Sequence, residues 1–178
     1  LSVSKNMQIN YCLPIIKNDK EEVFGIIDKN VNDYQYFEVW LDYVADLDDA
    51  FITNLTNLLD DRLIILFRRQ NLEAITMDLQ KRLDIISVIG RGESLVDIDI
   101  TQKEELAFVQ KSEVKINTII SYHNYQETPS VDELQTIMKD MEKQNPTIYK
   151  ITTFCHNEND ALRLLELQQF FKKENKTH

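Results

Sequence analysis

Short apolar runs alternate with longer amphipathic runs along the whole chain. The apolar runs, rich in Ile, Val, Leu, Tyr and Phe, predict strands at residues 8–16, 36–43, 62–68, 94–100, 116–123 and 147–154. The amphipathic runs predict helices at 20–30, 48–59, 103–111, 130–143 and 157–173, with helical segments between 71 and 89. Ser130 with Glu133 three residues later forms a capping-box sequence, which predicts the start of one helix at this serine.

This alternation amounts to about six βα units of roughly 30 residues each, which is typical of an α/β fold with a parallel sheet. Its strands should be buried on both faces, and the apolar stripe of the last helix should include Leu162, Leu165 and Leu167. No segment rich in Pro, Gly or Ser divides the chain, so we expect one domain over residues 1–178.

Two architectures contain such units: an open doubly wound sheet and an incomplete (β/α)8 TIM barrel that lacks two units. A doubly wound sheet gathers its functional residues at one switch point, whereas a barrel displays them at the ends of many strands. Polar residues mark five successive predicted strands here, which favours the barrel-like fold. They are Glu38, Asp42, Arg68, Asp97, Asp99, Ser121, His123 and Lys150.

Charge and hydropathy exclude several classes of protein. The chain has 30 acidic and 20 basic residues and a net charge of −10, whereas a nucleic-acid surface needs a basic patch. No apolar run reaches the roughly 18 residues of a membrane span, and no basic segment leads into an apolar stretch at the N-terminus. We therefore expect a cytoplasmic protein with neither nucleic acid nor membrane as a partner.

Cysteine, histidine and glycine usage argues against the common metal and nucleotide sites. Cys12 and Cys155 are predicted to be reduced, buried packing residues. His123, His156 and His178 do not cluster with them at metal-ligand spacing, so we expect no structural zinc site. The chain's three glycines cannot form a Walker loop or a dinucleotide fingerprint.

Lys150 is the residue with the clearest chemical implication. A lysine within a strand is costly to bury as an ammonium ion, and the neutral amine that burial favours attacks ketones to form imines. The preceding predicted strand ends in His123, which can move a proton near neutral pH and shares a face with Ser121. Together they indicate Schiff-base chemistry. The plainer alternative is a lysine that reaches solvent and a core histidine bonded to backbone.

The other polar residues leave more than one interpretation. Asp97 and Asp99 share a face and could either perform acid–base work or pair with an interior cation. Arg68 could bind a carboxylate or pair with Glu38. Arg69, its neighbour in the sequence, is expected on the surface.

Several segments, in this order, resemble the type I 3-dehydroquinate dehydratase family. Residues 119–129, with His123 and a Thr-Pro pair, resemble the family's strand-five motif, and the run around Lys150 resembles the strand with its imine-forming lysine. Residues 38–42, 65–68 and 96–100 are similar to its strands two, three and four.

This resemblance implies a shikimate-pathway lyase without metal or cofactor. Lys150 would form an imine with the ring ketone of the small-molecule substrate, 3-dehydroquinate. His123 would move the protons as water is expelled to give 3-dehydroshikimate. Glu38 and Arg68 would line the substrate pocket.

The chain departs from the family's pattern in three ways. Trp40 stands where the pattern has arginine, and a Glu-Gly-Gly after strand three is absent, which leaves Glu73 as a shifted candidate for the carboxylate that orients the histidine. The last two strands, with an arginine for the substrate carboxylate and a glutamine on a closing loop, have no counterpart. Their absence would expose sheet edges, so we predict that this gap is covered either by a homodimer or by rearrangement of a terminus. A catalytically inactive barrel that acts as a binding module and a class I aldolase-type lyase are the alternative functions.

Overall fold

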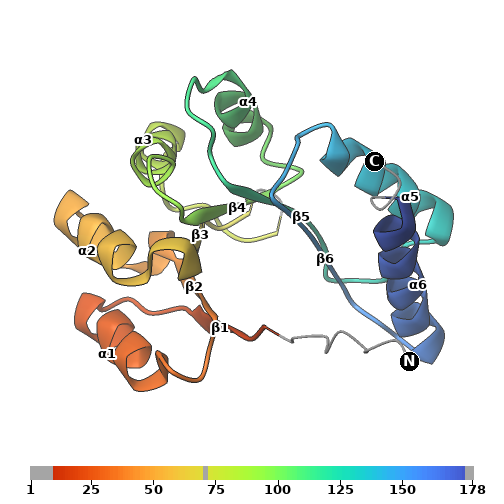
Figure 1. Ribbon diagram of the computed structural model, residues 1–178, viewed down its shortest axis with the longest axis horizontal. Helices are drawn as coiled ribbons and strands as arrows, with labels where there is room; N and C mark the ends of the chain where they lie inside the picture. Colours follow the sequence, from red (N-terminus) through yellow and green to blue (C-terminus); the bar gives the residue numbers. More distant parts are fainter. Residues whose placement is uncertain (1–9, 70–71, 175–178) are drawn as a thin grey trace, which may run out of the picture. The chain divides into compact units, whose positions relative to one another are not determined.

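The structure, a computed structural model, describes residues 10–69 and 72–174 (Figure 1). Strands and helices alternate along it. The strands are β1 (Cys12–Ile15), β2 (Tyr36–Trp40), β3 (Leu63–Leu66), β4 (Leu95–Asp99), β5 (Thr118–Asn124) and β6 (Ile148–Thr153). The helices are α1 (Lys20–Asn30), α2 (Asp49–Leu59), α3 (Leu79–Ile89), α4 (Lys103–Lys111), α5 (Val131–Glu142) and α6 (Glu158–Glu174), with short 3-10 helices η1 (Leu41–Tyr43) and η2 (Asp60–Arg62).

The strands follow one another in the sheet in the order of the sequence, β1-β2-β3-β4-β5-β6. The pairs β1–β2, β2–β3, β3–β4 and β5–β6 are parallel. A doubly wound sheet reverses its order at a switch point, whereas a barrel keeps sequence order. The fold is therefore an α/β fold of the incomplete (β/α)8 TIM-barrel type, with six βα units among the described residues, which confirms the predicted fold class.

Element boundaries differ from the predicted ones where the chain turns. The strand predicted at 36–43 ends at Trp40, because the next three residues form η1. The helix predicted within 71–89 begins only at Leu79, where the side chain of Asp78 accepts the backbone N–H of Lys81. Residues 8, 9 and 71 of the predicted elements lie outside the described residues.

Contacts divide the chain into two compact units, which are described separately. The first comprises residues up to Asp97 together with Ser112–Asn117, and therefore contains β1 to β3, α1 to α3 and most of β4. Its centre is β3, whose four residues are all buried. Helix α2 covers it with Phe51, Ile52, Leu55 and Leu59, and each such buried side chain contributes about 1.5–3 kcal/mol.

The second unit comprises Ile98–Lys111 and the chain from Thr118 onward. Strand β5 is mostly buried, and α5 buries Leu134, Met138 and Met141. The predicted capping box is confirmed: Ser130 accepts the backbone N–H of Glu133, whose carboxylate accepts the N–H of Ser130.

Burial of the terminal elements corrects three predictions. Strand β6 is half-buried to exposed along its length, not buried on both faces. On α6, Leu167 is buried, but Leu162 and Leu165 are 54% and 56% exposed, so they are not part of the buried stripe. Cys12 and Cys155 are both exposed and form no disulfide with each other, because Cys12 begins the first strand and Cys155 lies two residues beyond the end of the last one.

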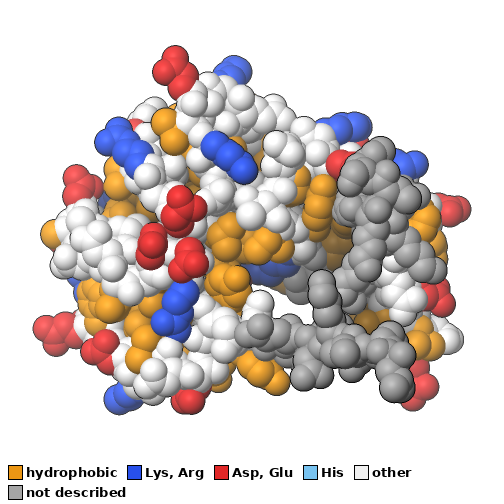
Figure 2. Space-filling model, viewed as in Figure 1, with side chains coloured by type: hydrophobic (Ala, Val, Ile, Leu, Met, Phe, Trp, Pro, Cys, Tyr) orange, Lys and Arg blue, Asp and Glu red, His pale blue; other side chains and the backbone are white. Residues whose placement is uncertain are grey.

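The surface mixes charges with apolar side chains. In the face drawn in Figure 2, acidic and basic side chains are interspersed, and hydrophobic side chains reach the surface between them. None of the helices in the described part of the chain is long and apolar enough to cross a membrane.

Candidate active site

The second unit contains a buried histidine–carboxylate pair. His123 Nδ1 lies 2.8 Å from Asp99 Oδ2, and the two side chains are 3% and 1% exposed. They come together because the end of β4 runs beside β5, where Ile100 N donates to Ser121 O at 2.8 Å. A carboxylate only accepts, so neutral His123 carries its proton on Nδ1, and Nε2 is the nitrogen with a lone pair for a further proton.

Asp99 is held as a carboxylate by its neighbours. Its Oδ1 accepts the backbone N–H of Thr101 at 2.9 Å and the Thr101 hydroxyl at 2.7 Å. Burial alone would raise the pKa of Asp99, but the hydrogen bonds from His123 and Thr101 outweigh it and hold this pKa below its usual value. Asp99 is therefore the charged partner of His123. Glu73, the shifted candidate for this role, pairs with Arg69, and the carboxylate bonded to His123 is that of Asp99.

Lys150 lies on the neighbouring strand, on the same face as the histidine. Ser121 is the register partner of Lys150, and His123 is the partner of Thr152. Because side chains alternate along a strand, Lys150 shares the face of Ser121 and His123, and strand spacing puts the Cα atoms of Lys150 and His123 about 8 Å apart. Lys150 is half-buried.

Hydrogen bonds tie the loop after β5 to the loop after β6. The Thr128 hydroxyl meets the Thr153 hydroxyl at 2.8 Å and donates to Phe154 O at 3.0 Å. His156 Nε2 donates to Gln126 O at 2.8 Å. These contacts were not expected from the sequence, although Thr128 belongs to the Thr-Pro pair of the histidine motif.

Arg163 of α6 adds a clamp on the segment that leads into α5. Its Nη1 donates to Thr128 O and to Pro129 O, both at 2.9 Å, and lies 3.4 Å from Asp160 Oδ1. The clamp fixes the Thr-Pro pair at the end of the histidine motif.

In the first unit, Arg68 is oriented by residues that follow β2. Its backbone N–H donates to Asp42 Oδ2 at 2.9 Å, and its Nε lies 3.7 Å from the same oxygen. Its guanidinium lies 3.8 Å from the centre of the Tyr43 ring and donates to Ala74 O at 3.2 Å. Burial raises the pKa of Asp42, and the hydrogen bond and charge of Arg68 only partly offset this. Arg68 therefore pairs with Asp42. It does not pair with Glu38, which was one of the two interpretations offered by the sequence.

Trp40 and Arg69 form a second cation–aromatic pair in this unit. Arg69 is only 3% exposed, which corrects its predicted place on the surface. Its guanidinium lies 4.8 Å from the centre of the Trp40 ring and 3.2 Å from Glu73 Oε1. Trp40 Nε1 in turn donates to Glu38 Oε1 at 3.3 Å. Trp40 stands at the position where the family's pattern has arginine. The buried guanidinium of Arg69 therefore places a positive charge beside that position.

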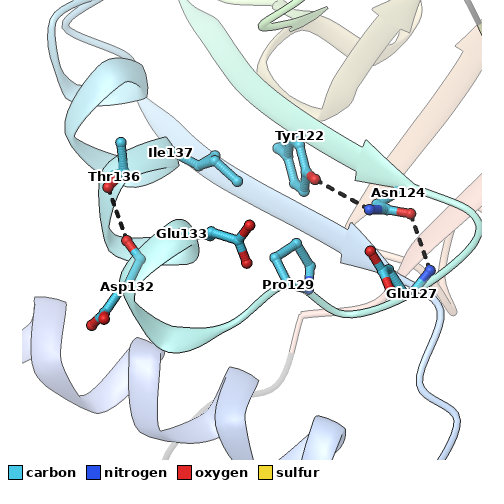
Figure 3. Close-up of a pocket in the computed structure, with 8 residues that line it drawn as sticks. All are labelled: Tyr122, Asn124, Glu127, Pro129, Asp132, Glu133, Thr136 and Ile137. Atoms are coloured by element: carbon cyan, nitrogen blue, oxygen red, sulfur yellow. Dashed lines mark hydrogen bonds between the residues drawn. The ribbon is translucent and has the colours of Figure 1, made fainter.

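A separate cavity of about 420 Å³ lies between β5 and α5 (Figure 3). Tyr122, Asn124, Pro129 and Ile137 line it, together with three carboxylates, Glu127, Asp132 and Glu133. Asn124 is fixed there by hydrogen bonds to the Tyr122 hydroxyl at 3.3 Å and from Glu127 N at 3.1 Å. Because Tyr122 alternates with Ser121 and His123 along the strand, this cavity is on the other face of β5 from the histidine.

The family model for type I 3-dehydroquinase matches residues 11–178. The structure resembles 3-dehydroquinate dehydratase from Geobacillus kaustophilus HTA426 with a TM-score of 0.76 and 21% identity, over 90% of this chain and 67% of that one. The type I enzyme from Clostridium difficile, solved with covalently modified comenic acid, gives 0.71 and 22%, over 88% and 67%. The Enterococcus faecalis enzyme gives 0.70 and 19%, over 93% and 77%.

The chain spans about two thirds of the length of the first two of these enzymes. At such identities the structural likeness establishes the fold, whereas the family match extends over nearly the whole sequence. The chain belongs to the type I 3-dehydroquinase family.

Proposed function

We propose that the protein is a dehydroquinate dehydratase-like lyase that converts 3-dehydroquinate to 3-dehydroshikimate through an imine on Lys150. The observation that carries this proposal is the buried His123–Asp99 pair, one strand away from Lys150 and on the same face. Membership of the type I 3-dehydroquinase family supports it, as does the likeness to the Clostridium difficile enzyme, which was solved with covalently modified comenic acid.

In this mechanism Lys150 is the nucleophile. Its neutral amine adds to the ring ketone, and loss of water together with uptake of one proton from the solvent gives a protonated imine. The positive nitrogen withdraws electrons from the adjacent carbon, so a proton on that carbon becomes acidic. Hydrolysis after the elimination consumes one water and restores both the lysine and the ketone of the product.

His123 is the general base and then the general acid. Its Nε2 accepts the proton from the carbon beside the imine, and the resulting imidazolium is stabilised by the Asp99 carboxylate at Nδ1. The imidazolium then gives that proton to the departing hydroxyl group, which leaves as water. Asp99 fixes the tautomer and the orientation of the His123 ring, as the aspartate of a serine-protease triad does for its histidine.

Arg68 and Glu38 are the proposed substrate-binding residues. Arg68 carries a fixed guanidinium, held by Asp42, Tyr43 and Ala74, and a fixed planar fork suits a carboxylate of the substrate. Glu38 has a carboxylate oxygen oriented by the Trp40 indole N–H, which suits a substrate hydroxyl.

One observation favours a second candidate function, a non-catalytic binding module. Trp40 occupies the position of a cationic contact in the family's pattern. The loss of this one contact, of about 1.5–3 kcal/mol, would lower the rate on the order of 10- to 10²-fold. Imine formation would then persist while turnover slows.

Turnover of 3-dehydroquinate, followed by the ultraviolet absorbance of the conjugated product, tests the leading proposal. We expect product formation that His123→Gln and Lys150→Met each abolish, while Tyr125→Phe, a change beside His123 outside the proposed chemistry, retains it. Absence of product at millimolar substrate contradicts the lyase proposal. Borohydride trapping with a panel of keto-sugars then tests the aldolase-type alternative.

We further propose that the protein self-associates through the β6 side of its sheet. In the described part of the chain β6 is the last strand in the sheet order, and Phe154, Leu162 and Leu165 are all more than half exposed. Sedimentation velocity should show a dimer, and Leu162→Glu with Leu165→Glu should shift it towards monomer. A wild-type monomer at high micromolar concentration contradicts this proposal.

A further inference from the structure

The turn that joins β4 to α4 is closed by its own hydrogen bonds. Gln102 N donates to Asp99 O at 2.8 Å, and Asp99 N donates to Gln102 Oε1 at 2.8 Å. Ile100 N, between them, is bonded to Ser121 O on β5. The backbone of Asp99 is therefore fixed from both sides, independently of its carboxylate.

The two oxygens of the Asp99 carboxylate have different partners. Oδ2 faces His123 Nδ1 at 2.8 Å, and Oδ1 accepts two hydrogen bonds from Thr101, one from the backbone and one from the hydroxyl at 2.7 Å. The hydroxyl bond is the shorter of the two. A carboxylate held at one oxygen cannot rotate without losing these bonds, so its other oxygen stays directed at the histidine.

The geometry points to Thr101 as a positioning residue, whose hydroxyl keeps Asp99 ionised and directed at His123. The catalytic role of Thr101 in this inference rests on the proposed function. The hydrogen bonds of Thr101 and His123 to Asp99 do not depend on which substrate the protein uses. Thr101 acts on His123 through Asp99, whose two carboxylate oxygens contact one of these residues each.

The charged neighbours of Asp99 do not replace this contact. His123 faces it from β5, and Lys150 shares the face of His123 on β6. On α4, Glu105 meets the side chain of Gln102 at 3.5 Å. Asp97, two residues before Asp99 in the sequence, is itself a carboxylic acid and brings no positive charge that could hold Asp99 ionised. The Thr101 hydroxyl is therefore one of the few contacts that favour the ionised form, and it comes from an exposed residue that can be changed without disturbing the core.

Thr101→Val and Thr101→Ser form a matched pair for the test. Valine keeps the branched shape and the backbone N–H but removes the hydroxyl, whereas serine keeps the hydroxyl. The titration of the Asp99 side-chain carboxyl is followed by ¹³C NMR from pH 7 down to the onset of acid unfolding, with Asp99→Asn to assign the signal. Solvent exchange of the His123 Nδ1 proton is measured on the same samples.

We expect Thr101→Val to raise the pKa of Asp99 by about one unit and to speed exchange of the Nδ1 proton about tenfold, while Thr101→Ser follows the wild type. A wild-type titration or a wild-type exchange rate in Thr101→Val overturns the inference, as does a serine variant that behaves like the valine one. Neither measurement uses turnover. If only the dehydration assay fails, the proposed function is rejected. The positioning role of Thr101 is then still decided by the titration and the proton exchange.

Discussion

Replacing Asp99 by asparagine removes the charge opposite His123 while keeping the size of the side chain. The carboxylate accepts hydrogen bonds at both oxygens, from His123 and from Thr101. An asparagine has one acceptor and one donor group. Its N–H therefore faces either the backbone N–H of Thr101, or His123 Nδ1, which must then give up its proton and adopt the other tautomer. The variant should fold, because the backbone of the turn keeps its own bonds to Gln102.

The magnitude follows from the number and type of bonds lost. A hydrogen bond to a charged group contributes about 1.5–3 kcal/mol, so we expect the free energy of unfolding at pH 7 to fall by about that amount. For a domain of this size each kcal/mol corresponds to about 2–4 °C, so the melting temperature should fall by roughly 3–12 °C. A double-mutant cycle with His123→Gln should give a coupling energy of about 1–2 kcal/mol.

The pH dependence of the effect has a definite sign. The pKa of Asp99 is lower in the folded protein than in the unfolded chain, so folding favours its ionised form. The stabilisation is therefore fully present above the unfolded-state pKa and is lost as the pH falls through the folded-state pKa. The difference between wild type and Asp99→Asn should persist from pH 7 to pH 5 and shrink below that range.

Urea unfolding followed by circular dichroism at several pH values measures both quantities. Two results would refute the reasoning: no difference in stability at pH 7, or a difference that stays as large in acid as at neutral pH. The first would mean that the charge of Asp99 contributes nothing in the fold. The second would mean that the loss comes from packing and not from the carboxylate.

Two further perturbations test packing at the end of α3 and hydrogen bonding in the loop after β5. Gly90→Ala should cost about 1–3 kcal/mol in urea unfolding, because a β-carbon there would lie 2.6 Å from Ile116 Cγ1. Gly25→Ala, in the middle of α1, is the matched control. A β-carbon there would meet nothing within 4 Å, so this change should raise the free energy of unfolding by up to about 1 kcal/mol. Equal effects of the two substitutions would contradict the packing argument. Arg163→Met should cost about 1–3 kcal/mol and speed amide exchange in the loop after β5, because its guanidinium binds the carbonyl oxygens of Thr128 and of the next residue. Unchanged exchange in that loop would argue against the clamp.

Local sequence signals determined much of the fold. The helices at 20–30 and 103–111 begin and end where the pattern predicted them, and the Ser130–Glu133 capping box forms as expected. These features depend on residues a few positions apart, so the sequence alone contains them. The βα alternation likewise predicted a parallel sheet, and the spread of polar residues over many strands favoured the barrel order that the sheet has.

The partners of the polar side chains were harder to predict. Glu73 was only a shifted candidate for the partner of His123, and the end of β4, which runs beside β5, brings Asp99 there. Arg69 was expected in solvent because a charged side chain is rarely buried, yet it lies on the Trp40 ring with Glu73 as its carboxylate. Both outcomes depend on strand register and on residues distant in sequence, which no local pattern specifies.

The burial of the terminal elements β6 and α6 was also not predicted correctly from the sequence pattern. An apolar composition suggested that β6 is buried on both faces, but its position as the last strand in the sheet order leaves it partly exposed. In α6, leucines lie on opposite sides of the helix, and spacing cannot decide which side meets the sheet. Leu167 is buried there, whereas Leu162 and Leu165 face outward.

Borohydride reduction in the presence of 3-dehydroquinate tests the central claim most directly. Intact mass and peptide mapping should show one covalent adduct on Lys150, absent from Lys150→Ala and still present in Asp99→Asn. Failure to trap an adduct at high ligand concentration, or an adduct on another lysine, would contradict the account of Lys150 as the imine-forming residue.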